Sequence, residues 1–116
     1  MSQSNTDRIK QYFRRQYETE EGSVEENINA LFAENAVYHL GGGKTLTREA
    51  IAKPARLLRE TPKSERVVRV SNFSEQGNTV SFHMHMRARG QDGKPWETDS
   101  NYVWQFNDEG KVIEVN

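Results

Sequence analysis

The chain has 116 residues, with 16 basic and 17 acidic side chains that leave a net charge of −1. This length predicts one domain, residues 1–116, with one core, and the balanced charge excludes the basic patch that a nucleic-acid partner would need. The chain has no cysteine and no apolar run near the roughly 20 residues of a membrane span, so we expect a cytoplasmic protein without disulfides, thiolate metal sites or a membrane partner.

The N-terminal part of the sequence predicts a hairpin of two helices. The first helix is capped by one of residues 5–7 and has arginine and glutamine opposite an apolar stripe, which consists of Ile9, Tyr12, Phe13 and Tyr17. After the polar residues 19–22, Ser23 and Glu26 have the spacing of a capping box, in which each side chain accepts a hydrogen bond from the other residue's backbone N–H. The box opens a second helix with the inward stripe Val24, Ile28, Leu31 and Phe32.

A glycine-rich stretch follows the first predicted strand, residues 36–40. The letters G-K-T, from Gly43 to Thr45, look like the end of a P-loop, but the glycine that this motif requires five residues earlier is replaced by Tyr38. Nucleotide binding through a P-loop is therefore excluded. We interpret the glycines as a turn into a second short strand, residues 44–46, because glycine adopts backbone angles that are closed to other residues.

A third helix is expected after this hairpin. Thr47 caps it, and Ile51, Ala55 and Leu58 face inward at helical spacing. Pro54 falls in the middle of the expected helix, and proline has no backbone N–H to donate. We therefore expect a kink at this position.

From residue 66 onward apolar residues alternate with polar ones, which is typical of half-buried strands. Tight-turn sequences separate four such runs, the last of which is residues 111–115; these turns are Gln76-Gly77-Asn78, Asp92-Gly93 and Asp108-Glu109-Gly110. The second half of the chain is therefore predicted to be an antiparallel meander.

The order of these elements, together with A-x-N-A-V-Y-H-L before the glycine turn and F-N-D-E-G-K-V-I-E in the last hairpin, resembles the nuclear transport factor 2-like superfamily. Within it the chain is most similar to SnoaL-like and ketosteroid isomerase-like proteins. The resemblance implies an α+β fold, the cystatin-like roll, in which a cone-shaped, curved and mostly antiparallel sheet wraps around three N-terminal helices. It also implies a pocket at the wide end of the cone.

The resemblance implies roles for individual residues. Tyr102 corresponds to the position at which ketosteroid isomerases keep a protonated aspartate, and a phenol can donate the same hydrogen bond to a developing oxyanion. Leu40 corresponds to the position of the general base, and leucine cannot take a proton. His39 beside it becomes the candidate base if its side chain points inward. The family's first-helix tyrosine is matched by Tyr12 or Tyr17.

The even-numbered face of the later strands has the composition of a ligand-binding wall, mostly apolar with a few hydroxyl groups. On this face Val80, Phe82 and Phe106 are interpreted as packing on the helices. The candidate ligand-binding residues of the whole chain are Tyr12, Tyr17, Tyr38, Leu40, Met84, Met86, Ser100 and Trp104.

Polar side chains on the opposite strand face provide further candidates. Asp99 is a candidate acid or base, although strict alternation turns it away from Tyr102 unless a bulge near Pro95 reverses the strand. His83 and His85 share that face at a spacing that metal sites use, but they fit a polar outer surface or a subunit contact more simply. His39 would lie three strands away, on the order of 14 Å, too far to share one ion. We expect no metal site.

The sequence thus predicts a protein that binds a small, apolar, ring-containing molecule and forms a homodimer through its sheet. As an enzyme it would need no cofactor and would catalyse an isomerisation, cyclisation or dehydration. Tyr102 would then steady an enolate-like oxygen while His39 or Asp99 moves the proton. The alternative is a non-catalytic ligand-binding or dimerisation module.

Overall fold

The computed structural model describes residues 4–89 and 92–116. The helical elements are α1 (Asn5–Phe13), the π-helical turn η1 (Arg14–Glu18), α2 (Val24–Leu31), η2 (Gly41–Gly43), α3 (Ala52–Glu60) and η3 (Lys63–Glu65). The strands are β1 (Phe32–His39), β2 (Thr45–Thr47), β3 (Val67–Gln76), β4 (Thr79–Arg89), β5 (Pro95–Phe106) and β6 (Val112–Val115). No helix within the described residues is long and apolar enough to cross a membrane.

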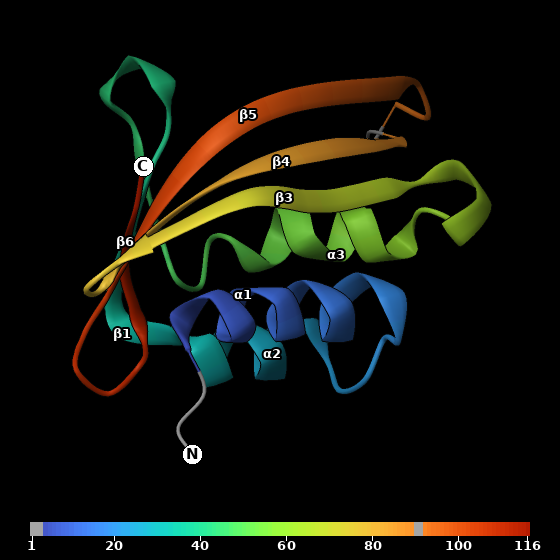
Figure 1. The fold of residues 1–116 in the computed structure, drawn as a ribbon. Helices are drawn as coiled ribbons and strands as arrows, with labels where there is room; N and C mark the ends of the chain where they lie inside the picture. The colour runs from blue at the N-terminus through green and yellow to red at the C-terminus, as the bar shows by residue number, and fades with distance from the viewer. Residues whose placement is uncertain (1–3, 90–91) are drawn as a thin grey trace.

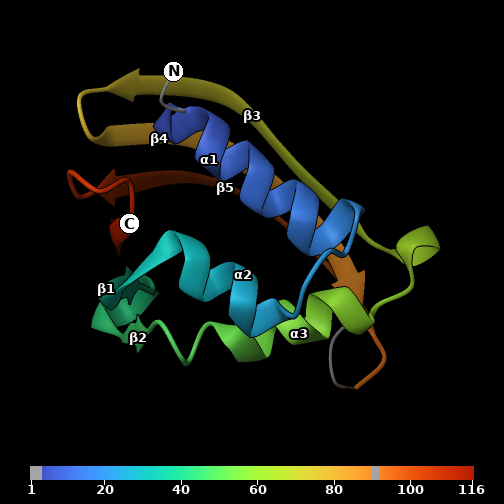
Figure 2. The same ribbon diagram turned by 90° about the horizontal axis from the view of Figure 1, so that it is seen from below.

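The strands of the described residues form one sheet in the order β2-β1-β6-β5-β4-β3. Neighbouring strands run antiparallel except for β1 and β6, which pair in parallel. Figures 1 and 2 show α1, α2 and α3 on the concave side of this sheet, beneath the arch of β3, β4 and β5. The predicted α+β fold, a curved and mostly antiparallel sheet wrapped around the helices, is confirmed.

The core forms where the helical stripes meet the concave face of the sheet. In β4 and β5, which pair without a break, every second residue faces the helices, so that Val80 lies opposite Trp104. Burying one valine or isoleucine side chain contributes about 1.5–3 kcal/mol relative to leaving it exposed. The apolar side chains that are almost completely buried are Ile9, Ile28, Val80, Val112 and Val115.

The predicted meander is present, and its three tight turns contain Gly77, Gly93 and Gly110 at positive φ values of 58°, 77° and 79°. The first strand differs from its predicted bounds, because β1 starts at Phe32, directly after α2, and ends at His39. Leu40 therefore follows the strand instead of ending it. The glycine turn between β1 and β2 requires glycine at position 42, where φ is 77°.

The N-terminal cap of α1 differs from the prediction, whereas that of α2 agrees with it. Ser4 caps α1, in place of the expected residues 5–7, and its hydroxyl oxygen accepts a hydrogen bond from the Asp7 N–H at 3.1 Å. The capping box of α2 is confirmed by both of its bonds, from Glu26 N to Ser23 Oγ at 3.1 Å and from Ser23 N to Glu26 Oε1 at 3.3 Å.

The start of α3 overturns the expected kink. Thr47 Oγ1 accepts a hydrogen bond from the Ala50 N–H at 3.4 Å, but a separate turn follows and α3 itself begins only at Ala52. Pro54 therefore lies in the first helical turn, where backbone N–H groups have no partner within the helix. Its missing N–H breaks nothing, so the prediction of a kink was wrong.

Gln16 ties η1 to the other helices through buried hydrogen bonds. It was predicted on the exposed side of the first helix, but it is 0 % exposed. Its amide nitrogen donates to the Val24 carbonyl at 3.2 Å, and its amide oxygen accepts from Asn27 at 3.0 Å and from Arg59 at 2.9 Å. Gln16 lies seven residues after Ile9, and this helical spacing places it on the buried face of the helix although its side chain is polar.

Arg66 connects the end of α3 to the end of η1. Its guanidinium group donates to the carbonyl oxygens of Leu58, Arg59 and Thr61 at 2.9–3.1 Å, and to that of Tyr17 at 2.6 Å. It also pairs with the Glu20 carboxylate at 2.7 Å. Since Arg66 is only 7 % exposed, one side chain satisfies several helix-end carbonyls that water cannot reach freely.

We expect the substitution Arg66→Met to lower the free energy of unfolding by about 2–4 kcal/mol, because it leaves buried carbonyl groups without donors. Urea denaturation followed by circular dichroism measures this change. Arg69→Met on the exposed side of β3 is the matched control, expected to remain within about 0.5 kcal/mol of the unsubstituted protein. Equal losses in the two variants would contradict the assignment of Arg66 as a structural clamp.

Candidate functional site

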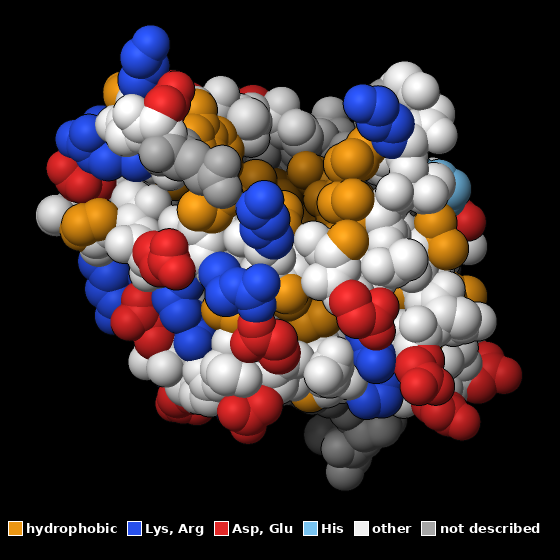
Figure 3. All heavy atoms as spheres, turned by 180° about the vertical axis from the view of Figure 1, so that it is seen from behind, with side chains coloured by type: hydrophobic (Ala, Val, Ile, Leu, Met, Phe, Trp, Pro, Cys, Tyr) orange, Lys and Arg blue, Asp and Glu red, His pale blue; other side chains and the backbone are white. Residues whose placement is uncertain are grey.

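A cavity of about 190 Å³ lies between the helices and the concave face of the sheet. From behind, the molecule has a hollow in which hydrophobic side chains are visible (Figure 3). Leu40 is 41 % exposed and Pro54 is exposed as well, so the β1–β2 hairpin and α3 form the mouth of the cavity. The lining residues are Tyr12, Phe13, Tyr17, Phe32, Tyr38, Leu40, Leu46, Ile51, Pro54, Ala55, Leu58, Met84, Met86 and Trp104.

Most of the residues proposed from sequence to bind a ligand lie around this one cavity. Both first-helix tyrosines, Tyr12 and Tyr17, contribute to its wall, so the choice between them disappears. Ser100 is the exception: it lies opposite Met84 on β5 but does not line the cavity. The other predicted residues in the wall are Tyr38, Leu40, Met84, Met86 and Trp104. Their contact with a ligand stays a prediction.

The candidate catalytic residues are not brought together. Tyr102 lies beside the cavity wall, with its ring centroid 6.3 Å from that of Tyr38. His39 is on the other face of β1, where its Nε2 lies 3.4 Å from Glu114 Oε2 and its side chain is exposed. Asp99 is on the outer face of β5, because the pairing of β4 with β5 has no bulge near Pro95.

Three tyrosines, Tyr12, Tyr17 and Tyr38, line the cavity, and the ring of Tyr102 lies 6.3 Å from that of Tyr38. Burial raises the pKa of Tyr12 to about 12, and it also raises the pKa values of Tyr17 and Tyr38. These hydroxyl groups therefore stay protonated at neutral pH. They can donate hydrogen bonds to a ligand, but they are poor bases.

Sequence reasoning missed half of the cavity wall. Phe13, Ile51, Ala55 and Leu58 were recognised as inward-facing positions of helices, but a core stripe and a cavity wall have the same helical spacing. No periodicity separates the two cases. The missed wall residues are Phe13, Phe32, Leu46, Ile51, Pro54, Ala55 and Leu58.

The chemistry of the wall is nearly uniform. No Asp, Glu, His, Lys or Arg is among the described residues that line the cavity. The indole N–H of Trp104 is buried without a hydrogen-bond partner, packed among the rings of Phe13, Phe32 and Phe82 at centroid distances of 5.3–5.8 Å. The site is thus suited to holding an apolar molecule and offers hydroxyl groups as its polar contacts.

A family model for the SnoaL-like domain matches residues 6–115. The chain belongs to the SnoaL-like family. No curated protein shows a significant match to its sequence.

Solved structures share the fold of this SnoaL-like domain at low sequence identity. A candidate SnoaL-like polyketide cyclase from Jannaschia sp. CCS1 superposes with a TM-score of 0.74 and 17 % identity over 99 % of this chain and 88 % of its own. A cystatin-fold protein from Novosphingobium aromaticivorans superposes with a TM-score of 0.75 and 17 % identity, over 98 % of this chain and 97 % of its own. SalBIII is an epoxide hydrolase/cyclase-like enzyme of pyran ring formation in salinomycin. It superposes with a TM-score of 0.73 and 16 % identity, over 96 % of this chain and 86 % of its own.

The outer face of this SnoaL-like domain carries a network of histidines and carboxylates across β4 and β5. Asp99 Oδ1 lies 2.8 Å from His83 Nε2 and 3.0 Å from His85 Nδ1, and His85 Nε2 lies 3.0 Å from Glu97 Oε2. The oxygens of Asn101 and Asp99 accept hydrogen bonds from His83 and raise its pKa, and the hydrogen bonds from the two histidines lower the pKa of Asp99. Among the described residues, no group of three or more such side chains is arranged to hold a metal ion.

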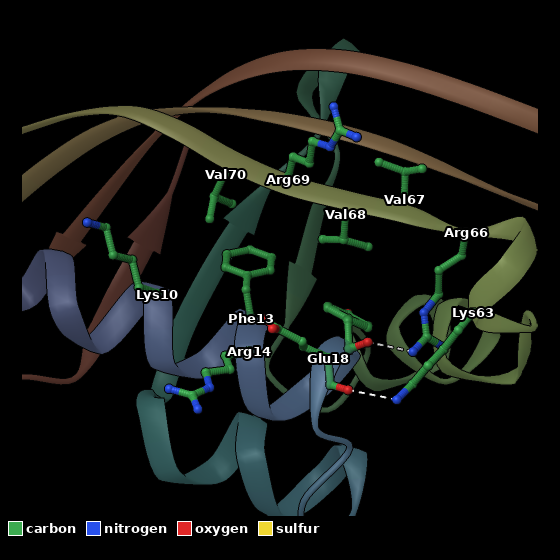
Figure 4. Close-up of a pocket in the computed structure, with 11 residues that line it drawn as sticks. Lys10, Phe13, Arg14, Glu18, Lys63, Arg66, Val67, Val68, Arg69 and Val70 are labelled. Atoms are coloured by element: carbon green, nitrogen blue, oxygen red, sulfur yellow. Dashed lines mark hydrogen bonds between the residues drawn. The ribbon is translucent and has the colours of Figure 1, made fainter.

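A larger hollow of about 740 Å³ lies on the surface between α1, η1 and β3 (Figure 4). Lys10, Arg14 and Lys63 surround it, and Phe13 and Tyr17 belong to its wall as well as to that of the inner cavity. The Lys63 ammonium group donates to the Glu18 carbonyl at 2.7 Å. Because its walls are charged and open to solvent, this hollow is less suited to an apolar ligand than the inner cavity.

The raised pKa of Tyr12 predicts a loss of stability at alkaline pH. An unfolded tyrosine ionises near pH 10, whereas folded Tyr12 holds its proton to about pH 12. The stabilisation is therefore complete below pH 10 and is lost as the pH rises to 12, by about 3 kcal/mol. In a Tyr12→Phe variant we expect this loss of stability between about pH 10 and pH 12 to disappear. Urea denaturation at a series of pH values measures the free energy of unfolding of both proteins. Parallel pH profiles for the two proteins would contradict it.

Proposed function

We propose that this protein binds a small, apolar, ring-containing molecule in its inner cavity. One observation carries the proposal: a cavity of about 190 Å³ remains between helices and sheet, although packed interiors normally fill such space with side chains. Its wall is apolar apart from tyrosine hydroxyl groups, which is the composition of small-molecule sites. The exposed Leu40 at its mouth offers a route from solvent.

The absence of a base from the cavity wall favours binding over catalysis. Proton abstraction needs a group that can take a proton near neutral pH, and none of the described wall residues is a carboxylate or a histidine. His39 and Asp99, the groups proposed for this role, have their side chains on the outer face of the sheet. A proton on a ligand inside the cavity is out of their reach.

An acid/base enzyme without a cofactor is the second candidate, and the Tyr38–Tyr102 pair favours it. The Tyr102 phenol lies next to Tyr38 at the edge of the cavity and can donate a hydrogen bond to an enolate-like oxygen. The likeness to a candidate polyketide cyclase and to SalBIII supports a reaction such as cyclisation, isomerisation or dehydration. The base in such a reaction would have to come from the substrate or from water.

We further propose that two copies pair through the outer face of the sheet. No described helix covers this face, and the histidine–carboxylate network lies on it. Histidines and acids presented in one plane suit a polar contact between subunits.

Filling the cavity should abolish binding. In Ala55→Leu three added carbons point from α3 into the cavity, and we expect binding of a probe such as p-cresol to weaken at least about tenfold, equivalent to a loss of about 1.4 kcal/mol. Fluorescence of Trp104 in a Trp96→Phe background measures binding. Ala30→Leu on the exposed side of α2 is the matched control, and its affinity should not change. Undiminished binding to Ala55→Leu would place the ligand elsewhere.

Two substitutions test catalysis once a turned-over substrate is found. We expect Tyr102→Phe to lower kcat about 100-fold or more if its hydroxyl stabilises an oxyanion, because removing one such donor costs roughly that factor. His39→Ala should leave kcat unchanged, since the imidazole faces Glu114 outside the cavity. A large effect of His39→Ala with none for Tyr102→Phe would reverse these roles.

A further inference from the structure

The dimensions and lining of the cavity restrict the class of ligand, an inference that rests on the proposed binding function. We propose that the cavity takes a neutral molecule with a single six-membered ring and an oxygen substituent, such as a simple phenol or cyclic ketone. Fused-ring compounds and organic anions are excluded.

The size limit follows from the volume. An engineered apolar cavity of about 150 Å³ accommodates benzene, whereas pockets for drug-sized molecules span about 300–1,000 Å³. At about 190 Å³, the cavity of this chain has room for one ring and a small substituent. A second fused ring would require the wall to move.

The wall cannot move easily on its inner side, because a cluster of aromatic rings fills the end of the cavity. The Trp104 ring lies 5.3 Å from Phe32, 5.8 Å from Phe13 and 6.2 Å from Tyr12, measured between ring centroids. These rings come from β5, β1 and α1, and each is at most 9 % exposed. Displacing any of them would disrupt contacts between the sheet and the helices, since packed cores rearrange at a cost.

The charge limit follows from the lining, because no Lys, Arg or His is among the described residues that line the cavity. The positive charge of Arg59 acts on Tyr12 and Tyr17, but its N–H groups are bonded to the carbonyls of Gln16 and Gly22 at 2.9 and 2.6 Å. Arg66 is likewise occupied by helix-end carbonyls and by Glu20. A carboxylate in the cavity would lose its hydration and gain no ionic partner, so anions bind poorly.

The preference for an oxygen follows from the tyrosines of the wall. Tyr12, Tyr17 and Tyr38 line the cavity, and each carries one O–H hydrogen. Tyr12 accepts a hydrogen bond from Gln16 Nε2 at 3.4 Å, and its own hydroxyl hydrogen can still be donated. A ligand oxygen can accept such a hydrogen, and a pure hydrocarbon cannot.

A series of matched probes tests the limits on ligand size and charge and the preference for an oxygen. Binding to the full chain is measured by isothermal titration calorimetry and tryptophan fluorescence at neutral pH. We expect p-cresol to bind roughly three- to tenfold more tightly than toluene, as one hydrogen bond predicts. Both 2-naphthol and benzoate should bind at least about tenfold more weakly than p-cresol.

Two adjacent leucines of α3 supply a matched pair of variants for the size limit. Leu58 lines the cavity and Leu57 does not, so Leu58→Ala should tighten 2-naphthol at least about tenfold and Leu57→Ala should leave it unchanged. Because Leu58 is buried and its truncation destabilises the core, Met86→Ala, at a half-buried wall position of β4, provides a second enlargement of the cavity.

The outcomes separate this inference from the proposed function. Equal binding of 2-naphthol and p-cresol to the unsubstituted protein, or no response of 2-naphthol to either cavity enlargement, would overturn the single-ring limit while binding itself stands. Equal affinities for toluene and p-cresol would remove the oxygen requirement, and tight binding of benzoate would remove the charge limit. If none of the probes binds, the proposed function itself fails.

Discussion

The hydrogen bonds of two guanidinium groups at the junction of the helices are the constraint on which the site depends. Arg59 and Arg66 donate to backbone carbonyls at the ends of η1 and α3, which would otherwise be buried without partners. These bonds hold a π-helical turn in place at the end of α1. In this turn Gln16 accepts a hydrogen bond from Arg59 and Tyr17 lines the cavity, so the clamp and the site share one element.

The two faces of the sheet carry opposite chemistry because side chains alternate along each strand. The concave face presents methionines and aromatic rings to the helices, while the outer face presents His83, His85 and Asp99. Ionisable side chains thus lie on the outer side, and the wall of the cavity is apolar apart from tyrosine hydroxyl groups. This separation makes the cavity a place for recognition by shape and hydroxyl groups.

Burial also decides what the tyrosines can do. Removing a phenol from water disfavours its charged form, so the raised pKa values of Tyr12 and Tyr38 leave these hydroxyl groups as donors. The same burial makes a donor without an acceptor unfavourable, which creates a preference for ligands that carry oxygen. The aromatic cluster around Trp104 occupies much of the concave interior and limits the cavity to small molecules.

Local patterns in the sequence by themselves determined the strand alternation, the three glycine turns of the meander and the capping box at Ser23, because each depends only on neighbouring residues. Alternation also placed Asp99 on the face opposite Tyr102. Only the tertiary structure decided the inward turn of Gln16, the late start of α3 at Ala52 and the end of β1 before Leu40. It also decided that Phe13, Leu46 and Leu58 line the same cavity as Tyr12, Tyr17 and Tyr38, because such convergence depends on how distant elements pack and leaves no periodic trace along the chain.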